Sequence, residues 1–368
     1  MKILQITFNL SSGGAERFVV DLSNELVKDN DVVLMTLMDD KVEPEKNQFY
    51  LFDLDKRVKY KNLGIKKGGG FKFSVLWKVY KAMKKERAEV IHLHVRGVVN
   101  FCLLGIFLLC WRTTIVQTIH IDFKLHSTLV YKILFNTIGR LHKMRWAALS
   151  ESNYEDLKQA YPYVLCQRID NGRSPMHPTN EFEKVKAEIA KYKKTNNTKV
   201  LLHIARCAEQ KNQQLLIASV NELKIKGNDV ILLIIGDGFD SELGQQLKNN
   251  SGEGIYYLGT RKNISDYMLN SDLFCLSSSY EGLPITILEA LLSGVPVVST
   301  PVAGAKDVIK NSVTGVISSD YSETKYVNAL EYALNNLIVL KDNCMVEKDC
   351  SPYTMEACAK KYLAFYTE

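Results

Sequence analysis

The chain has 368 residues, of which 46% are hydrophobic and 24% charged, and its formal net charge is +6. These values are typical of a soluble globular protein and exclude a disordered chain, while the length suits two domains. The eight cysteines are scattered without a C-x-x-C pair, and the first residues lead straight into an apolar segment without a signal peptide. That pattern favours free thiols in the cytoplasm over a disulfide framework or a zinc site.

The positive charge is concentrated in the first half. Residues 56–87 contain twelve Lys and Arg but only one acidic residue, Glu86. Aromatic residues are interleaved with these cations: Phe71, Phe73, Trp77 and Tyr80. A basic, aromatic surface of this kind can make peripheral contact with an anionic membrane, and the alternative is a solvated helix face. Nothing else resembles a nucleic-acid-binding module, so no nucleic-acid partner is expected.

The first half alternates strand-like and helix-like segments. Apolar runs at residues 2–8, 32–37, 89–95 and 113–119 read as strands, with helical patterns between them. This alternation predicts a parallel sheet with crossover helices. The longest apolar run, residues 98–111, is shorter than the roughly 20 residues that a membrane-spanning helix needs. We expect a buried helix there, and a membrane-dipping helix is the alternative.

The second half repeats the same organisation. Continuous apolar, β-rich runs at residues 199–205, 229–236, 254–259, 273–278 and 295–300 read as buried parallel strands. Asn, Gly, Ser and Pro cluster at residues 168–178 and mark a boundary. The fold class is therefore α/β, with domains at residues 1–172 and 173–350. Ligands of such sheets bind outside the carboxyl ends of the strands, so the site is expected in a cleft between the domains.

Two loops after predicted strands have compositions suited to phosphate. The loop at residues 11–16 contains Gly13 and Gly14 ahead of a helix, where backbone and helix N-terminus can approach an anion. This loop lacks the G-x-G-x-x-G pattern, which argues against the hypothesis of a dehydrogenase. In the second half, Arg206 and Lys211 follow a strand five residues apart and suit a diphosphate, although two surface cations are the alternative.

Two glutamates flank a Gly-Leu-Pro corner in the stretch EGLPITILEALLSGVPVV, residues 281–298. Glu281 precedes the corner, and Pro284 is expected as the first residue of a helix that runs to Gly294. Glu289 then lies within an otherwise apolar helix, where a charge is costly unless a partner receives it. We expect both glutamates to border one pocket at the helix N-terminus; an ion pair with a basic neighbour is the alternative for Glu289.

This block resembles the E-x7-E signature of retaining glycosyltransferases of family 4. The similarity spans nearly the whole chain, because further segments follow the family's order: S-S-G-G-A-E-R, V-I-H-L-H, T-I-H, R-I-D-N-G, R-x4-K and the terminal S-P-Y-x-M-x-x-C-A-x-x-Y-L-x-x-Y. One departure is Ala205-Arg206-Cys207, where the family often has Gly-Arg-Leu. The resemblance implies the GT-B fold, with two Rossmann-like domains and a terminal segment, residues 351–368, whose helix crosses back to the first domain.

The resemblance also implies a donor, a nucleotide-diphosphate sugar, held mainly by the second domain. Arg206 and Lys211 would hold the diphosphate, Glu289 the ribose hydroxyls and Glu281 a hydroxyl of the transferred sugar. Backbone groups are expected to assist at Gly14, Gly282, Leu283, Ile285 and Thr286. His120 would contact the sugar from the first domain, His94 would lie at the acceptor end, and Thr260 and Arg261 would border the base. The residues expected to act in catalysis are Glu281, His120, Arg206 and Lys211.

The departing diphosphate must be neutralised, in many transferases by a metal bound to a D-x-D pair. Asp53-Leu54-Asp55 matches that string, but it lies in a basic surface stretch and is interpreted as chance. Arg206, Lys211 and the helix N-terminus can supply the positive charge, so no metal and no other cofactor are expected. His203, within a predicted strand, is expected to be a core histidine.

The sequence therefore predicts a cytoplasmic, metal-independent retaining glycosyltransferase, in contact with the inner face of the plasma membrane. It would transfer a sugar, with UDP favoured over GDP as the carrier, to a glycan or lipid-linked saccharide in bacterial surface-polysaccharide synthesis. The alternatives are a GT-B sugar-nucleotide epimerase, an inverting transferase, or an inert GT-B scaffold in a polysaccharide assembly complex.

Overall fold

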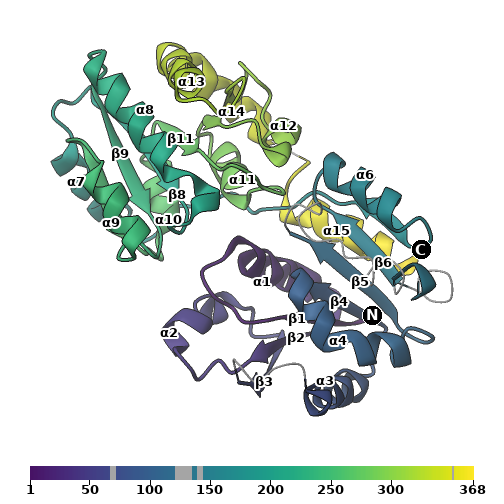
Figure 1. The fold of residues 1–368 in the computed structure, drawn as a ribbon. Helices are drawn as coiled ribbons and strands as arrows, with labels where there is room; N and C mark the ends of the chain where they lie inside the picture. The colour runs from purple at the N-terminus through teal and green to yellow at the C-terminus, as the bar shows by residue number, and fades with distance from the viewer. Residues whose placement is uncertain (67–71, 121–134, 139–143, 350–351) are drawn as a thin grey trace. The chain divides into compact units, whose positions relative to one another are not determined.

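The computed structural model describes residues 1–66, 72–120, 135–138, 144–349 and 352–368. They form two compact units. The first comprises Met1–Arg173 and Pro352–Glu368, and the second comprises Ser174–Ser351. Each unit contains a parallel sheet with helices packed on it (Figure 1).

The first unit contains a seven-stranded sheet in the order β3-β2-β1-β4-β5-β6-β7, and every neighbouring pair is parallel. Its strands are β1 (Lys2–Thr7), β2 (Asp31–Met38), β3 (Lys59–Ile65), β4 (Val90–His94), β5 (Thr114–Ile119), β6 (Met144–Ala148) and β7 (Leu165–Arg168). Its helices include α1 (Gly14–Leu26), α2 (Pro44–Asn47), η1 (Leu51–Asp53), α3 (Phe73–Glu86), α4 (Arg96–Leu109), α6 (Glu151–Ala160) and α15 (Met355–Thr367).

The second unit contains a six-stranded parallel sheet in the order β10-β9-β8-β11-β12-β13. Its strands are β8 (Lys199–Ile204), β9 (Val230–Ile235), β10 (Ile255–Gly259), β11 (Leu273–Leu276), β12 (Val297–Ser299) and β13 (Gly315–Ile317). Its helices include α7 (Phe182–Tyr192), η3 (Glu209–Lys211), α8 (Gln213–Ile225), α9 (Glu242–Asn249), α10 (Ile264–Leu269), α11 (Ile285–Leu292), α12 (Ala303–Val308), α13 (Glu323–Asn335) and α14 (Leu337–Asp349). The prediction of two doubly wound parallel sheets is confirmed.

The strands of the second sheet are buried on both faces. Leu201 and Leu232 belong to one hydrophobic cluster, while Val200 and Leu202, the neighbours of Leu201 in β8, belong to the other. Successive side chains of a strand point to opposite faces, so a strand covered on both sides must be apolar at every position. This requirement is why continuous apolar runs marked these strands in the sequence.

Four strands, β3, β6, β7 and β13, were not anticipated from the sequence. β3 lies at the sheet edge within the basic stretch, and most of its residues are only partly buried. A half-exposed edge strand does not need a continuous apolar run, so its pattern is weak. β13 is also an edge strand and has only three residues, too few to show any periodicity.

The apolar run at residues 98–111 forms most of α4, as predicted, but its end is not buried. Val98, Cys102 and Ile106 belong to the core of the first unit, whereas Phe107 and Trp111 are 57% and 67% exposed. No helix among the described residues is long and apolar enough to cross a membrane.

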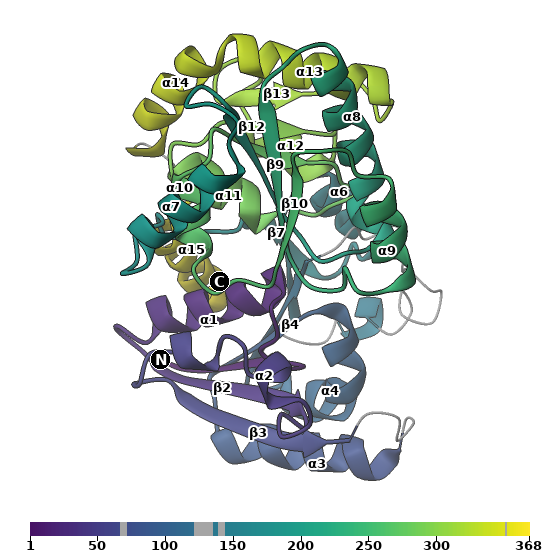
Figure 2. The same cartoon turned by 90° about the vertical axis from the view of Figure 1, so that its left-hand side faces the viewer.

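The C-terminal helix α15 belongs to the first unit and packs on α1 (Figure 2). The segment that leads into α15 is tied to the end of the first unit's main segment, because the backbone N–H of Arg173 donates to the carbonyl of Tyr353 at 2.8 Å. At the other end of the helix, the buried guanidinium of Arg145 donates to the carbonyl of Phe365. The helix is therefore held at both ends.

The start of α15 also packs closely against Gly172. A Cβ atom at position 172 would lie 2.5 Å from the carbonyl oxygen of Thr354 and 2.5 Å from the Cβ of Cys358. We expect Gly172→Ala to lower the free energy of unfolding by about 1–3 kcal/mol, because the backbone must shift to admit the methyl group. Urea denaturation followed by circular dichroism measures the change. Ser174→Ala, at an exposed position two residues away, is the control, and equal stability of the two variants would contradict this packing.

Candidate functional site

In both sheets the strand order reverses at one place. The first sheet reverses between β1 and β4, and the second between β8 and β11. At such a point the loops that follow the two strands diverge to opposite faces and leave a crevice at the carboxyl ends, where ligands of α/β sheets bind. Gly14 and His94 follow β1 and end β4, and Arg206, Lys211 and Glu281 follow β8 and β11. Sequence-predicted residues therefore lie at both reversal points.

In the second unit, the loops after β8 and β11 are joined by several hydrogen bonds. The backbone N–H of Ser279 donates to the carbonyl of Gln210 at 2.8 Å, and the side-chain amide of Gln210 donates to the carbonyl of Tyr280 at 2.9 Å. The hydroxyl of Ser277 donates to the carbonyl of Lys211 at 2.8 Å. These bonds hold the two loops in a defined relative position.

The same loops bring two predicted site residues into direct contact. The Nζ atom of Lys211 lies 2.5 Å from Oε1 of Glu281, which also accepts a hydrogen bond of 2.9 Å from the hydroxyl of Ser278. The two charged side chains are 19% and 11% exposed. An ion pair this sheltered is screened little by solvent, yet it remains accessible to a ligand.

Arg206 differs from Lys211 because its side chain is exposed while its backbone is fixed. Its carbonyl accepts a hydrogen bond of 2.9 Å from the side chain of Gln213. A Cβ atom on Gly236 would lie 2.0 Å from the carbonyl oxygen of Ala205. Gly236 therefore lets the end of β9 approach the Arg206 loop, while the guanidinium stays free to meet an anion.

The helix that carries the second glutamate is α11. Pro284 is its N-cap, with φ −65° and ψ 118°, and not its first helical residue as predicted. Ser293 is the C-cap, and Gly294 follows with φ +74°, a left-handed conformation that favours glycine at a helix end. Glu289 is buried, with 7% of its surface exposed. Its predicted contact with a ribose stays a prediction.

The backbone ahead of α11 is packed tightly against α12. Gly282, Leu283 and Ile285 are buried and Thr286 is partly exposed. A Cβ atom on Gly304, in α12, would lie 2.0 Å from the carbonyl oxygen of Gly282. α12 therefore supports the turn, and the first N–H groups of α11, which have no intrahelical acceptor, form a positive end suited to an anion.

Thr260 and Arg261, predicted to border the base, follow β10 at the edge of the second sheet. Thr260 is exposed. The Nε atom of Arg261 donates to the hydroxyl of Tyr267 at 3.1 Å, and that hydroxyl donates to Glu188 at 2.9 Å. Arg261 is thus oriented by side chains of α10 and α7, which no sequence pattern had indicated.

In the first unit, Gly14 is the first residue of α1 and Gly13 is its N-cap. A Cβ atom at Gly13 would lie 2.1 Å from a carboxylate oxygen of Glu16, so the side chain of Glu16 folds back over the start of its own helix. A carboxylate there complements the positive end of the helix. A larger side chain at position 13 would displace the carboxylate of Glu16 from this place.

The two predicted histidines of the first unit lie close together. The ring centroids of His94 and His120 are 5.7 Å apart, and Phe18 from α1 contacts both rings. His94 is fully buried. Burial lowers the pKa of His120 to about 4 and the pKa of His94 well below 6.5, so both rings are neutral at pH 7. Neutral imidazoles can exchange hydrogen bonds with sugar hydroxyls without introducing a charge.

The carboxylates of the Asp53-Leu54-Asp55 string are occupied by arginines. Arg17 contacts Asp53 at 2.5 Å. The guanidinium of Arg57 forms two hydrogen bonds to Asp55 and its backbone N–H a third, and these lower the pKa of that carboxyl to about 2. Over the described ranges, no group of three or more His, Cys, Asp or Glu residues could hold a metal ion. Metal independence stays a prediction.

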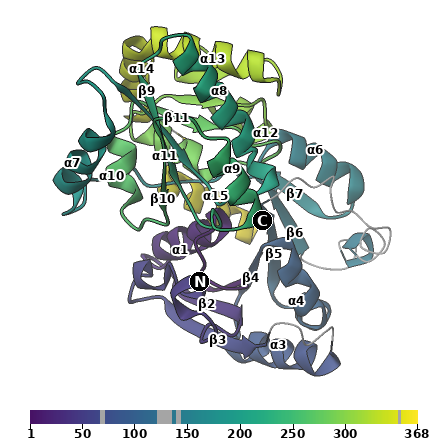
Figure 3. The same cartoon turned by 60° about the vertical axis from the view of Figure 1, so that its left-hand side comes forward.

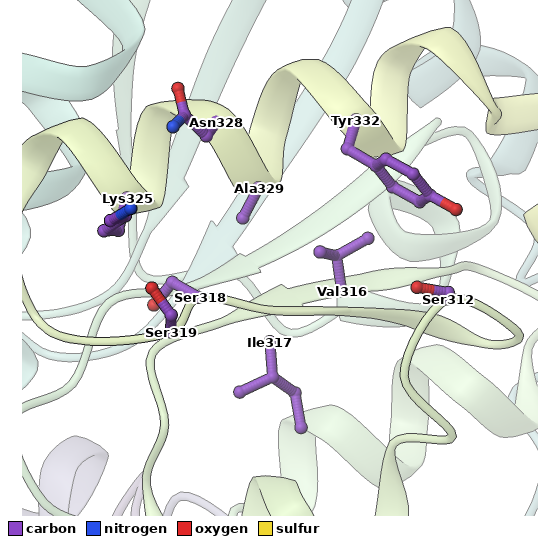
Figure 4. A pocket seen from close by; sticks show the side chains of 9 residues that line it. All are labelled: Ser312, Val316, Ile317, Ser318, Ser319, Lys325, Asn328, Ala329 and Tyr332. Atoms are coloured by element: carbon purple, nitrogen blue, oxygen red, sulfur yellow. The ribbon is translucent and has the colours of Figure 1, made fainter.

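A hollow of about 240 Å³ lies elsewhere in the second unit, between α13 and the edge strand β13 (Figure 4). The side chains that line it include Lys325, Asn328 and Tyr332 from α13 and Ser318 from the end of β13. None of the predicted site residues lines this hollow. His203 is fully buried and bonded to the carbonyl of Cys275, as expected for a core histidine.

Several side chains that position the predicted residues carry no clear signal in the sequence. Ser278, which bonds Glu281, lies in a triple-serine segment beside the motif, but serine hydroxyls have no spacing rule that assigns them a partner. Tyr362 and Tyr366, which contact the histidine region, stand four residues apart on α15 and therefore share one helix face. That spacing could have marked them as a pair, although not their target.

The fold and the two reversal points define a class of protein, the glycosyltransferases of the GT-B fold. The chain belongs to this class: residues 12–170 match the model of Glycosyltransferase Family 4, and residues 184–345 match the model of glycosyl transferases group 1. The protein is therefore an enzyme that transfers a sugar.

Two relatives match over most of their length. The chain is 26% identical over 288 residues, 72% of each chain, to the UDP-Gal:alpha-D-GlcNAc-diphosphoundecaprenol alpha-1,3-galactosyltransferase of Escherichia coli. It is 26% identical over 351 residues, 91% of this chain and 89% of the relative, to a Campylobacter jejuni alpha-1,4-N-acetyl-D-galactosaminyltransferase that acts on a GalNAc-containing diNAcBac-PP-undecaprenol. The crystal structure of Anabaena Alr3699/HepE with UDP and glucose has the same fold, with a TM-score of 0.79 at 17% identity over 100% of this chain and 99% of the other.

Three histidines of the first unit predict a stability that depends on pH. His92, His94 and His120 have lowered pKa values in the folded protein, so below about pH 6.5 the unfolded chain binds more protons than the folded one. We expect the free energy of unfolding to fall as the pH is lowered from 6.5 towards 4, by up to about 1.4 kcal/mol per pH unit for each histidine.

Urea denaturation at pH 7.5, 6.5 and 5.5 measures this slope. His120→Gln is expected to reduce it, whereas His177→Gln, at an exposed position, is expected to leave it unchanged. The same slope in both variants would show that His120 is not a buried neutral ring.

Proposed function

We propose that the protein transfers a hexose, with retention of configuration, from a UDP-sugar to a lipid-linked saccharide during synthesis of a bacterial cell-surface polysaccharide. The observation that carries this proposal is the contact between Lys211 and Glu281, beside the start of α11 at the β8–β11 reversal point. A cation and a helix N-terminus offer positive charge to a diphosphate, and the carboxylate beside them offers an acceptor to a sugar hydroxyl.

The proposed donor would occupy the second unit from the Arg206 loop to the end of β10. Arg206 can form a fork to one phosphate and Lys211 a point contact to the other. Backbone groups from Gly282 to Thr286, together with Gly14 in the first unit, would complete the phosphate contacts. Glu289 would accept from the ribose, and Thr260 and Arg261 would border the base.

The proposed mechanism depends on charge placement. Breaking the bond to the anomeric carbon passes through an oxocarbenium-like transition state while negative charge grows on the diphosphate. Arg206, Lys211 and the first N–H groups of α11 would stabilise that charge without a metal. Glu281 and His120 would orient the transferred sugar, with His94 on the acceptor side. The acceptor hydroxyl would attack from the face that the diphosphate leaves and pass its proton to the leaving phosphate, which retains configuration.

The relatives support the substrate classes. The Escherichia coli enzyme is named for UDP-Gal as donor and a diphosphoundecaprenol-linked GlcNAc as acceptor, and the Campylobacter jejuni enzyme for a PP-undecaprenol-linked saccharide. A lipid-linked acceptor lies at a membrane, so an enzyme that acts on it gains from peripheral contact with that surface.

The surface of α3 and α4 suits an anionic membrane. The two helices pack side by side (Figure 3), since the side chain of Met83 in α3 lies against Gly105 in α4. Glu86 is buried and paired with Lys61, so it does not offset the charge of α3. The exposed side chains of this α3–α4 surface are the cations Lys72, Lys78, Lys81, Lys84 and Lys85 and the apolar residues Phe73, Trp77, Phe107, Leu108 and Trp111. Cations attract anionic headgroups, and aromatic rings insert at the interface.

The donor contact predicts a loss of binding in Lys211→Ala. We expect UDP-sugars to raise the melting temperature of the native protein, and the affinity for the effective UDP-sugar to fall about 10- to 100-fold in the variant, because a charge-assisted contact is lost. The shift should persist in EDTA, since cationic side chains are proposed to replace the metal.

Lys226→Ala is the matched control, because Lys226 also pairs with a glutamate, at 3.1 Å, but lies at the end of α8. Equal effects of the two substitutions would contradict the donor site. Proton NMR of the anomeric position of the product tests the stereochemistry. A product of inverted configuration would contradict retention and indicate an inverting mechanism.

The proposed membrane contact predicts salt-sensitive binding to vesicles. The triple variant K81Q/K84Q/K85Q should bind vesicles of phosphatidylglycerol and phosphatidylcholine about 100-fold more weakly than the native protein at low salt, since each cation near the surface contributes about 1 kcal/mol. Co-sedimentation measures the bound fraction. K184Q/K186Q/K191Q removes the same charge from exposed positions of α7 and should leave binding unchanged. Native protein that ignores these vesicles would refute the membrane contact.

A further inference from the structure

One face of the first sheet is lined with polar side chains and covered by helices. The strand register pairs Gln5 with His92 and His94 with Thr118, so these four side chains share a face. All four are buried. The alternate positions of the same strands contribute Leu4, Ile6, Ile91 and Leu93 to the apolar core on the other face. Burying polar side chains costs free energy of hydration that apolar side chains do not lose. A buried polar layer therefore suggests a role beyond stabilising the fold.

The polar layer is bonded to the C-terminal helix. The hydroxyl of Tyr366 lies 2.7 Å from Nδ1 of His92, and the hydroxyl of Thr118 lies 2.7 Å from Nε2 of the same ring. The hydroxyl of Tyr362 lies 2.8 Å from that of Thr118. Both nitrogens of His92 are therefore held, one directly by α15 and the other through Thr118.

The ring of His92 in turn supports the two site histidines. Its centroid is 4.0 Å from that of His94, which is 5.7 Å from that of His120. The ring centroid of Phe18 lies 6.0 Å from that of His94, 5.4 Å from that of His120 and 6.1 Å from that of Tyr362. The rings pack in sequence from α15 to His120, so a displacement of His92 must be passed to its neighbours or leave a gap.

Two ring nitrogens at the far end of this series have no hydrogen-bond partner among the described residues: Nδ1 of His94 and Nε2 of His120. Nε2 of His94 lies 2.5 Å from Oε1 of Gln5. With Oε1 of Gln5 as the acceptor in this contact, Nε2 of His94 is the donor and Nδ1 keeps a lone pair. Buried polar atoms normally have partners, so each one that lacks a partner needs an explanation, such as a catalytic role, a water or an ion.

We propose that α15 positions the site histidines: Tyr366 and Tyr362 hold His92 and Thr118 so that the rings of His94 and His120 are presented in one orientation and one tautomer. Tyr366 and Tyr362 are then positioning residues that touch no substrate. The inference rests on the proposed function, in which His120 contacts the transferred sugar. It adds that the last helix of the chain tunes that contact.

Tyr366→Phe tests the inference, because it removes only the hydroxyl that holds Nδ1 of His92 and keeps the ring in the core. We expect kcat for sugar transfer from the UDP-sugar to be about 10-fold lower in the variant than in the native protein. The KM for the donor should change by less than about 2-fold, because a small misplacement of site groups lowers the rate more than the affinity. Tyr163→Phe, at an exposed position of the first unit, is the control and should change neither value. A kcat for Tyr366→Phe equal to that of the control would overturn the proposal.

A double variant separates positioning from simple packing. If Tyr366 acts through His92, Tyr366→Phe should have no further effect on kcat in a His92→Gln background, whereas independent effects would multiply. Melting temperatures of all variants show whether the loss follows the amount of folded protein. Multiplied effects, or a loss of rate that matches loss of folded enzyme, would reduce α15 to a structural role.

NMR of protein labelled with ¹⁵N-histidine gives a readout that needs no turnover. Tyr366→Phe should shift the ring ¹⁵N signals of His92 and His94, and unchanged His94 signals would refute the coupling. His120→Ala tests the underlying assignment: an unchanged kcat in that variant removes the proposed sugar contact, while the histidine signals still decide whether α15 sets the rings. A reduced kcat in His120→Ala with no effect of Tyr366→Phe would overturn only the inference about α15.

Discussion

The reversal of strand order within each parallel sheet is the constraint on which the rest of the molecule depends. Every strand in a parallel sheet ends at the same edge, but only where the order reverses do two neighbouring loops leave in opposite directions. β1 and β4 form this point in the first unit, and β8 and β11 form it in the second. The glycine loop, His94, the cations and the E-x7-E corner all lie after these strands or at their ends, although they are far apart along the chain.

The contact of Lys211 with Glu281 illustrates how such an edge can be stable without a ligand. A cation or a carboxylate that stood alone in a partly buried place would be destabilised by the loss of its hydration. Here they neutralise one another, and Ser278 adds a hydrogen bond to the carboxylate. Both groups keep some exposure, so the diphosphate and the sugar hydroxyl of the proposed donor would replace the internal partner and offset the cost of breaking the pair.

Parts of the fold were predictable because burial on two faces leaves a strong pattern. β8 and β9 are covered on both sides and appear as continuous apolar runs, whereas β3 and β13 lie at sheet edges and leave a weak pattern or none. The helix at α11 was predicted from its apolar residues, but Pro284 proved to be its N-cap. Proline has a φ value that suits both positions, so its identity alone does not separate them. The exposed end of α4 was missed because composition does not distinguish a buried helix from one with a free last turn.

By itself the amino-acid sequence determined the class of fold and most of the strands, and it supplied the residues proposed to meet a sugar nucleotide, because hydrophobic periodicity and short motifs are local properties of the chain. Only the tertiary structure decided which of these side chains are partners. Lys211 meets Glu281 across 70 residues, and His92 meets Tyr366 across 274. Hydrogen bonds of this range depend on strand order and register, which no local pattern encodes. The E-x7-E corner could therefore be recognised from its letters, whereas the hydrogen bonds that link the C-terminal helix to His92 and Thr118 could be found only in the folded chain.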